Sequence, residues 1–181
     1  MSTIPQEIKE PLGLVQVYTG NGKGKTTAAL GLSFRAAGRG LNVLFLQFLK
    51  PPENYGEHMM AERVPNITMM PLGVDHFVSK VPKDEDIRIT REALAKAEEL
   101  MATGEFDLVV LDESINAVRL NLLTSTELLE ALRRRPANIE VVLTGRGATP
   151  DILEYADLVT EMTLVKHPFD RGIDARKGIE Y

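Results

Sequence analysis

The stretch TGNGKGKTT at residues 19–27 holds the side chains best suited to chemistry in this sequence. It follows the apolar run 14–18 and precedes a segment with helical character. A strand that enters a glycine-rich turn and then a helix points backbone N–H groups and a helix N-terminus at one spot, which forms an anion site. Lys25 supplies a mobile positive charge for phosphate, and Thr26 supplies a hydroxyl ligand for Mg²⁺. We therefore predict that eight consecutive residues bind a nucleotide: Gly20, Asn21, Gly22, Lys23, Gly24, Lys25, Thr26 and Thr27.

This loop departs from the general phosphate-binding pattern G-x-x-x-x-G-K-[ST], because Thr19 stands where the first glycine belongs. One alternative is a glycine-rich turn without a ligand, which the sequence Gly24-Lys25-Thr26 and its flanking elements disfavour. A dinucleotide-binding fingerprint is another alternative, and it fails because the third glycine would fall on Lys25 or Thr27. The loop therefore predicts a nucleoside triphosphate bound with magnesium.

A second chemical feature is the acidic pair Asp112-Glu113, which ends the apolar run 108–111 in the manner of a Walker B segment. A carboxylate at the end of a buried strand commonly holds the magnesium of a phosphate-loop site. The alternative is that an acidic residue after an apolar run only caps the following turn. With the phosphate loop upstream, the metal role is favoured, and either Asp112 or Glu113 can hold the metal, directly or through water.

Apolar runs and helical patterns alternate along the chain and would position these residues at one edge of a sheet. We expect strands at 14–18, 42–49, 66–72, 106–113, 140–145 and 158–165, and helices at 26–38, 84–104, 125–136 and 149–156. The segment 53–66 is ambiguous and permits a short helix around 56–63. Ser125 is the expected cap of its helix. Strands separated by helices predict an α/β fold with a mostly parallel sheet covered on both faces, in a single domain over 1–181 with loose residues at 1–13.

The composition argues against several kinds of protein. The net charge of −5 is unsuited to a broad electrostatic grip on nucleic acid or on an anionic membrane. The absence of cysteine removes disulfides, thiol catalysis and thiolate metal sites. The first residues lack the features of a signal or transit peptide, and no apolar run approaches the roughly 20 residues that span a bilayer. We expect a cytoplasmic protein that binds neither nucleic acid nor membrane.

With these motifs in view, the sequence resembles the ATP:corrinoid adenosyltransferases of cobalamin biosynthesis over roughly residues 15–181. The loop GNGKGKT at 20–26 has the family's own form, including the displaced first glycine. The stretch TGRG at 144–147, followed by D-I-L and A-D, and the tail from 166 to 181 also match closely. The resemblance implies a RecA-like P-loop fold, and it gives a second possibility for residues 1–13, which can form a lid over the site in this family.

The resemblance also implies a reaction unlike ordinary phosphoryl transfer. The cobalt(I) of a corrinoid would attack the 5′-carbon of ATP, and the intact triphosphate would leave. Lys23, Lys25 and Mg²⁺, or Mn²⁺ in its place, would stabilise that leaving group, with Thr26 and Glu113 as magnesium ligands. The substrates would be ATP and cob(I)alamin or a precursor corrinoid. A flavodoxin-type reductase and a homodimer are the partners that the family implies.

The sequence departs from the family where the corrinoid would be bound. The family often has a G-x-G-F-T-W-like stretch, whereas residues 73–78 read GVDHFV and the chain has no tryptophan. Phe77 is a candidate for contact with the corrin. His76 is a candidate lower ligand of cobalt, weighed against an exposed loop histidine. Arg146, between two glycines at a strand end, is a candidate contact with phosphate or substrate, weighed against a surface role.

Two other functions stay open on the sequence alone. A P-loop ATPase or kinase that cleaves ATP at the γ-phosphate would also use the acidic pair. A nucleotide- or corrinoid-binding protein with little turnover would account for the altered stretch at 73–78.

Overall fold

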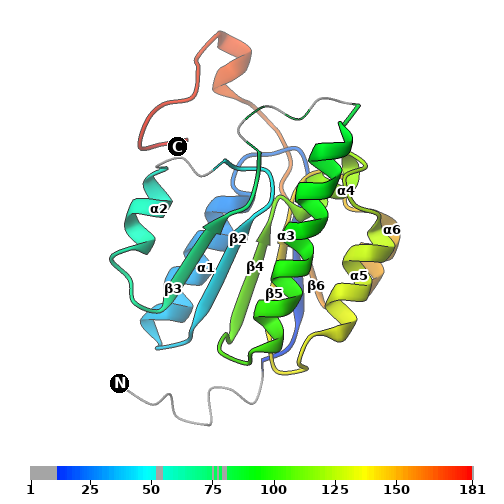
Figure 1. Cartoon of the computed structure of the whole chain (residues 1–181). Coiled ribbons are helices and arrows are strands. Elements are labelled where there is room, and N and C mark those ends of the chain that lie inside the picture. The colour runs from blue at the N-terminus through cyan, green and yellow to red at the C-terminus, as the bar shows by residue number, and fades with distance from the viewer. Residues whose placement is uncertain (1–11, 52–54, 75, 77, 79–80, 181) are drawn as a thin grey trace.

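Six parallel strands form one sheet with the order β3-β2-β4-β5-β1-β6 (Figure 1). The computed structural model describes residues 12–51, 55–74, 76, 78 and 81–180. The strands are β1 (Val15–Thr19), β2 (Val43–Gln47), β3 (Ile67–Pro71), β4 (Leu108–Asp112), β5 (Glu140–Thr144) and β6 (Leu158–Glu161). All pairings are parallel. The predicted α/β fold with a parallel sheet is confirmed.

Helices cover both faces of this sheet (Figure 1). They are α1 (Lys25–Gly38), α2 (Gly56–Ala61), α3 (Asp84–Ala102), α4 (Ser114–Arg119), α5 (Ser125–Arg134) and α6 (Pro150–Tyr155), followed by the 3₁₀ helix η2 (Pro168–Arg171). One apolar core lies between the sheet and α1, and a larger one lies on the side of α3 and α5. The strands β2, β4 and β5 are buried at every position, which is the expected result for parallel strands covered on two faces. Of the helices described, none is both long and apolar enough to cross a membrane.

Three local features differ from the sequence predictions. Ser125 is not the cap of α5. The cap is Thr124. Its hydroxyl accepts a hydrogen bond from the Glu127 N–H at 3.1 Å, and the Glu127 carboxylate accepts one from the Thr124 N–H at 2.7 Å. The six-residue helix α4 was not predicted. The last strand, predicted at 158–165, ends at Glu161.

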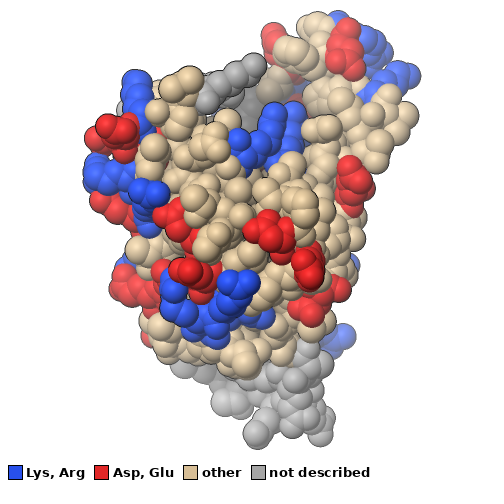
Figure 2. All heavy atoms as spheres, turned by 90° about the vertical axis from the view of Figure 1, so that its right-hand side faces the viewer, with Lys and Arg blue, Asp and Glu red and all other residues tan. Residues whose placement is uncertain are grey.

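The carboxyl ends of the strands meet at one edge of the sheet, and the chain segments that carry chemistry converge there. The loop after β1 and the residues after β2 and β4 lie at this edge. The tail after β6 rises above the same edge and ends beside it (Figure 1). On the face seen in Figure 2, basic and acidic side chains are interspersed below this tail.

Candidate active site

The phosphate loop joins β1 to α1 in a conformation that needs glycine. Gly20 and Gly24 have φ angles of 93° and 119°, which side chains other than glycine rarely adopt. Gly22 donates its N–H to the Met162 carbonyl at 2.7 Å, and a Cβ added to Gly22 would lie 2.7 Å from the same oxygen. The loop is therefore fixed against the chain that follows β6, with no room for larger residues.

Lys25 lies buried beneath this loop and holds it in shape. Its Nζ donates to the carbonyl oxygens of Gly20 at 2.8 Å and Gly22 at 2.5 Å. Burial, and then the positive charge of Arg146, lower the pKa of Lys25 below its ordinary value. Two cations so close together repel each other, and an anion bound between them relieves that repulsion. The loop is therefore arranged as an anion site, and Arg146 lines the same cavity, so its contact with phosphate or substrate stays a prediction.

Asp112 lies buried beneath the phosphate loop and is not exposed to the cavity. Its side chain is fully buried, and Oδ1 accepts hydrogen bonds from the hydroxyls of Thr26 at 2.8 Å and Thr144 at 2.6 Å. Burial raises the pKa of Asp112 above its ordinary value. The aspartate therefore fixes the direction of the Thr26 hydroxyl, whose oxygen keeps lone pairs for a metal.

Glu113 follows β4 in the left-handed conformation, with φ of 63°. Its carboxylate accepts a hydrogen bond from the Asn116 amide and lines the cavity that the phosphate loop opens into. Burial, and then the charge of Asp112, raise its pKa above the ordinary value. Of the two neighbouring carboxylates, Glu113 thus lines the cavity, and Asp112 lies buried behind the Thr26 hydroxyl.

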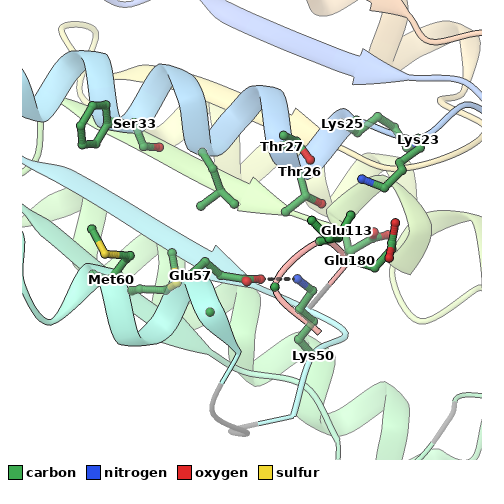
Figure 3. Close-up of a pocket in the computed structure, with 18 of the residues that line it drawn as sticks. Lys23, Lys25, Thr26, Thr27, Ser33, Lys50, Glu57, Met60, Glu113 and Glu180 are labelled. Atoms are coloured by element: carbon green, nitrogen blue, oxygen red, sulfur yellow. Dashed lines mark hydrogen bonds and ion pairs between the residues drawn. The ribbon is translucent and has the colours of Figure 1, made fainter. Parts of the chain in front are cut away.

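The cavity has a volume of about 660 Å³ and is charged at one end and apolar at the other (Figure 3). Lys23, Lys25 and Glu113 lie at the charged end, and Ser33 and Met60 lie at the far end. The volume falls in the range of small-molecule sites, about 300–1,000 Å³. A ligand with a charged and an apolar part fits this shape.

The structure brings most of the predicted site residues together. Residues 22–27 line the cavity with Glu113 and Arg146. Gly20 contributes through its carbonyl, and Asn21 is exposed. His76 lies apart, where its Nε2 is 2.9 Å from Asp86 Oδ1 at the start of α3. Phe77 lies outside the described residues, so its contact with a corrin stays a prediction.

Sequence reasoning missed two groups of cavity residues. Lys50 and Glu57 form an ion pair of 2.7 Å in the middle of the cavity. Lys50 directly follows the predicted second strand and could have been found by the rule that ligands bind at the carboxyl ends of strands. The tail contributes His167 and residues 178–180, which lie in the stretch 166–181 that carries the family resemblance but that was given no role in the site.

The residues at the charged end suit a magnesium ion bound together with phosphate. Among the described residues there is no group of three or more His, Asp or Glu side chains that would hold a metal without other ligands. Mg²⁺ usually takes one or two carboxylates with substrate phosphates and water. The Thr26 hydroxyl and the Glu113 carboxylate meet that requirement beside the loop.

Comparisons of the sequence with a family model and with individual proteins identify the same family. A family model described as "ATP:corrinoid adenosyltransferase BtuR/CobO/CobP" matches residues 11–181. The corrinoid adenosyltransferase of Pseudomonas aeruginosa is 38% identical over 176 residues, covering 97% of this chain and 87% of the relative. Those of Escherichia coli K12 and Salmonella typhimurium are 38% and 37% identical, and each match covers 97% of this chain and 89% of the relative. The crystal structure of the flagellar accessory protein FlaH from Methanocaldococcus jannaschii superposes with a TM-score of 0.57 at 15% identity, over 83% of this chain and 71% of that one, which shows a shared fold.

Proposed function

Since this chain belongs to the ATP:corrinoid adenosyltransferase family, we propose that its cavity holds ATP while the 5′-deoxyadenosyl group passes to a corrinoid. The chain is an adenosyltransferase of cobalamin biosynthesis by this membership. The observation that carries the proposal for the site is the charged end of the cavity. There the phosphate loop, the Thr26 and Asp112 pair, Glu113 and Arg146 converge.

The reaction we propose forms one bond and breaks one. Cobalt(I) of the reduced corrinoid donates an electron pair to the 5′-carbon of ATP and becomes formally cobalt(III). The bond between that carbon and the triphosphate oxygen breaks, and its electron pair leaves with the triphosphate. Because the nucleophile is the cobalt of the substrate, no Ser, Cys or His of the chain is needed for covalent attack.

The chain's task is to stabilise the charge that develops on the departing triphosphate. Lys25 is fixed at the centre of the loop, and Lys23 and Arg146 line the same end of the cavity. Donors and cations held in place before the reaction stabilise such charge without reorganising during it. Magnesium, when bound, would neutralise charge on the triphosphate oxygens, with Thr26 and Glu113 as its protein ligands. Mn²⁺ has the same preference for oxygen ligands.

The partners of the reaction follow from its chemistry. Cobalt(I) must be supplied by reduction, so we propose an electron-donating reductase of the flavodoxin type. A homodimer is proposed from the family resemblance. The stretch 73–78 is proposed to contact the corrinoid. The reaction would serve either the synthesis of adenosylcobalamin or the salvage of corrinoids.

Formation of the cobalt–carbon bond tests the proposed function. The protein is incubated without oxygen with Mg-ATP and chemically reduced cob(I)alamin, and the corrinoid spectrum is followed. We expect a stoichiometric conversion to a light-sensitive adenosylcorrinoid. An unchanged cob(I)alamin spectrum, with ATP bound, would instead favour a binding protein with little turnover.

The Glu113→Gln substitution tests the assignment of the metal ligand. We expect the Mg²⁺ concentration for half-maximal activity to rise by about ten- to a hundredfold, because an amide oxygen binds the cation more weakly than a carboxylate does. The measurement is a magnesium titration at saturating ATP. Glu154→Gln, an exposed residue of α6, is the control and should leave the titration unchanged. A loss of turnover with an unchanged magnesium requirement would contradict the assignment.

A further inference from the structure

The Arg146 turn, which is formed by residues 145–148 after β5, packs directly against α4. A Cβ added to Gly145 would lie 2.5 Å from the Asn116 backbone nitrogen in the first turn of α4. A Cβ added to Gly147 would lie 3.2 Å from Arg119 Cδ. The glycines on either side of Arg146 therefore permit a close approach between the turn and the helix that follows the acidic pair.

The Asn116 side chain connects the Arg146 turn to the proposed metal ligand. Its Oδ1 accepts a hydrogen bond from the Arg146 backbone N–H at 2.8 Å, and its amide donates to the Glu113 carboxylate. A backbone N–H can only donate, so it must face the amide oxygen, and the amide nitrogen then faces Glu113. Leucine, which has a similar size, can make neither contact.

The backbone of Glu113 is held as well as its side chain. Its N–H donates to Thr144 Oγ1 at 2.9 Å, and its carbonyl accepts a hydrogen bond from the Ala117 N–H at 2.9 Å. Glu113 has a φ of 63°, which residues other than glycine keep only where their surroundings enforce it. Loss of the Asn116 contact would therefore release the carboxylate, which lines the cavity, while the backbone stays in place.

The Arg146 turn is also connected to the phosphate loop. The Ala148 N–H donates to the hydroxyl of Thr19, the last residue of β1, at 3.3 Å. This contact gives a role to the side chain that stands where the general pattern has glycine. The Arg146 side chain lines the cavity, and its positive charge, after burial, lowers the pKa of Lys25. The turn thus lies between the side proposed for the metal and the side proposed for the triphosphate.

We propose that Asn116 is a positioning residue for adenosyl transfer, which holds the Glu113 carboxylate for the metal and the Arg146 turn for the triphosphate at the same time. This inference rests on the proposed function, which makes ATP and Mg²⁺ the ligands of the charged end of the cavity. Asn116 is not among the described residues that line the cavity, and it acts through two that do. Binding of the metal and binding of the triphosphate therefore both depend on one side chain that touches neither.

Two measurements on the Asn116→Leu variant test this proposal. The first is the Mg²⁺ requirement, which is the Mg²⁺ concentration for half-maximal activity at saturating ATP. We expect it to rise about tenfold, because the Glu113 carboxylate loses its fixed direction. The second is calorimetric binding of inorganic tripolyphosphate in EDTA. We expect binding to weaken about threefold, because the Arg146 turn loses a hydrogen bond.

Substitutions of the two cavity residues should each change one measurement. Arg146→Met should weaken tripolyphosphate binding in EDTA by about fivefold and leave the Mg²⁺ requirement unchanged. Glu113→Gln should raise the Mg²⁺ requirement, and tripolyphosphate in EDTA should bind to it equally well or more tightly, because a negative charge is removed. The combined effect is therefore expected for Asn116→Leu and for neither of the other variants.

Double variants show whether Asn116 acts through these two residues. Added to Glu113→Gln, the Asn116→Leu substitution should raise the Mg²⁺ requirement no further. Added to Arg146→Met, it should weaken tripolyphosphate binding no further. A residue that only supported the fold would add its effect in both backgrounds. Asn138→Leu, at an exposed position before β5, is the matched control and should change neither measurement.

An Asn116→Leu variant that leaves either measurement unchanged would overturn the assignment. Effects that simply add to those of Glu113→Gln and Arg146→Met would also overturn it. These outcomes leave adenosyl transfer by the unaltered protein intact. Failure of the proposed function would be seen differently, as unaltered protein that binds ATP and tripolyphosphate but forms no adenosylcorrinoid.

Discussion

Replacement of Lys25 by methionine is expected to lower the rate of adenosyl transfer by about a hundred- to a thousandfold. Methionine keeps an unbranched side chain that is one atom shorter, and it removes the charged amino group. The loss would have two causes, since Lys25 would stabilise the leaving triphosphate in the proposed reaction and also holds the loop through the carbonyls of Gly20 and Gly22. The measurement is the rate of adenosylcorrinoid formation at saturating Mg-ATP and reduced corrinoid.

Lys23 provides the comparison for this prediction. Its side chain is exposed at the mouth of the cavity. An exposed cation is screened by water, so Lys23→Met should lower the rate by about tenfold or less. Equal effects of the two substitutions would show that the catalytic contribution does not depend on the buried position of Lys25, contrary to the account given above.

The Asp112→Asn substitution is expected to change activity and stability in opposite directions. Activity should fall about a hundredfold, because the charge that orients the Thr26 hydroxyl beside the metal is lost. The metal-free protein, by contrast, should become more stable near neutral pH. Burial raises the pKa of Asp112, so the ionised carboxylate is less favourable in the fold than in the unfolded chain.

The pH dependence gives the sign of this stability effect. A group whose pKa is raised by folding contributes stability that is fully present below its unfolded pKa, about 4 for Asp. That contribution is lost as pH rises through the folded pKa. The difference in Tm between Asp112→Asn and the unaltered protein, measured in EDTA, should therefore grow from acid to neutral pH. A lower Tm for the variant at neutral pH would show that the hydrogen bonds from Thr26 and Thr144 outweigh the burial of the charge.

The parts of this fold and site that depend on local sequence could be predicted. The conformation of the phosphate loop follows from its own glycine pattern. The buried strands on either side of it follow from short apolar runs, so each of these features depends on only a few neighbouring residues. The cap of α5 is a closer case, because Thr124 and Ser125 are both able to cap a helix. The carboxylate of Glu127 decides between them, since it lies three residues after Thr124.

The remaining features depend on contacts between segments far apart in the chain. The sequence could not choose between Asp112 and Glu113 as the metal ligand. In the structure Glu113 has a left-handed backbone conformation and lines the cavity, whereas Asp112 is buried beneath Thr26, and this difference supports Glu113 as the proposed ligand. Glu57 lies in a segment without clear periodicity, and it becomes a site residue only through its contact with Lys50 after another strand.

The phosphate product of the reaction tests the central claim most directly. The protein is incubated without oxygen with Mg-ATP and cob(I)alamin, and the products are followed together by phosphorus NMR and by the corrinoid spectrum. We expect one intact triphosphate for each adenosylcorrinoid formed, and no turnover of ATP when the corrinoid is omitted. Formation of ADP and phosphate at the same rate with and without corrinoid would contradict the account, because the phosphate loop would then serve cleavage at the γ-phosphate.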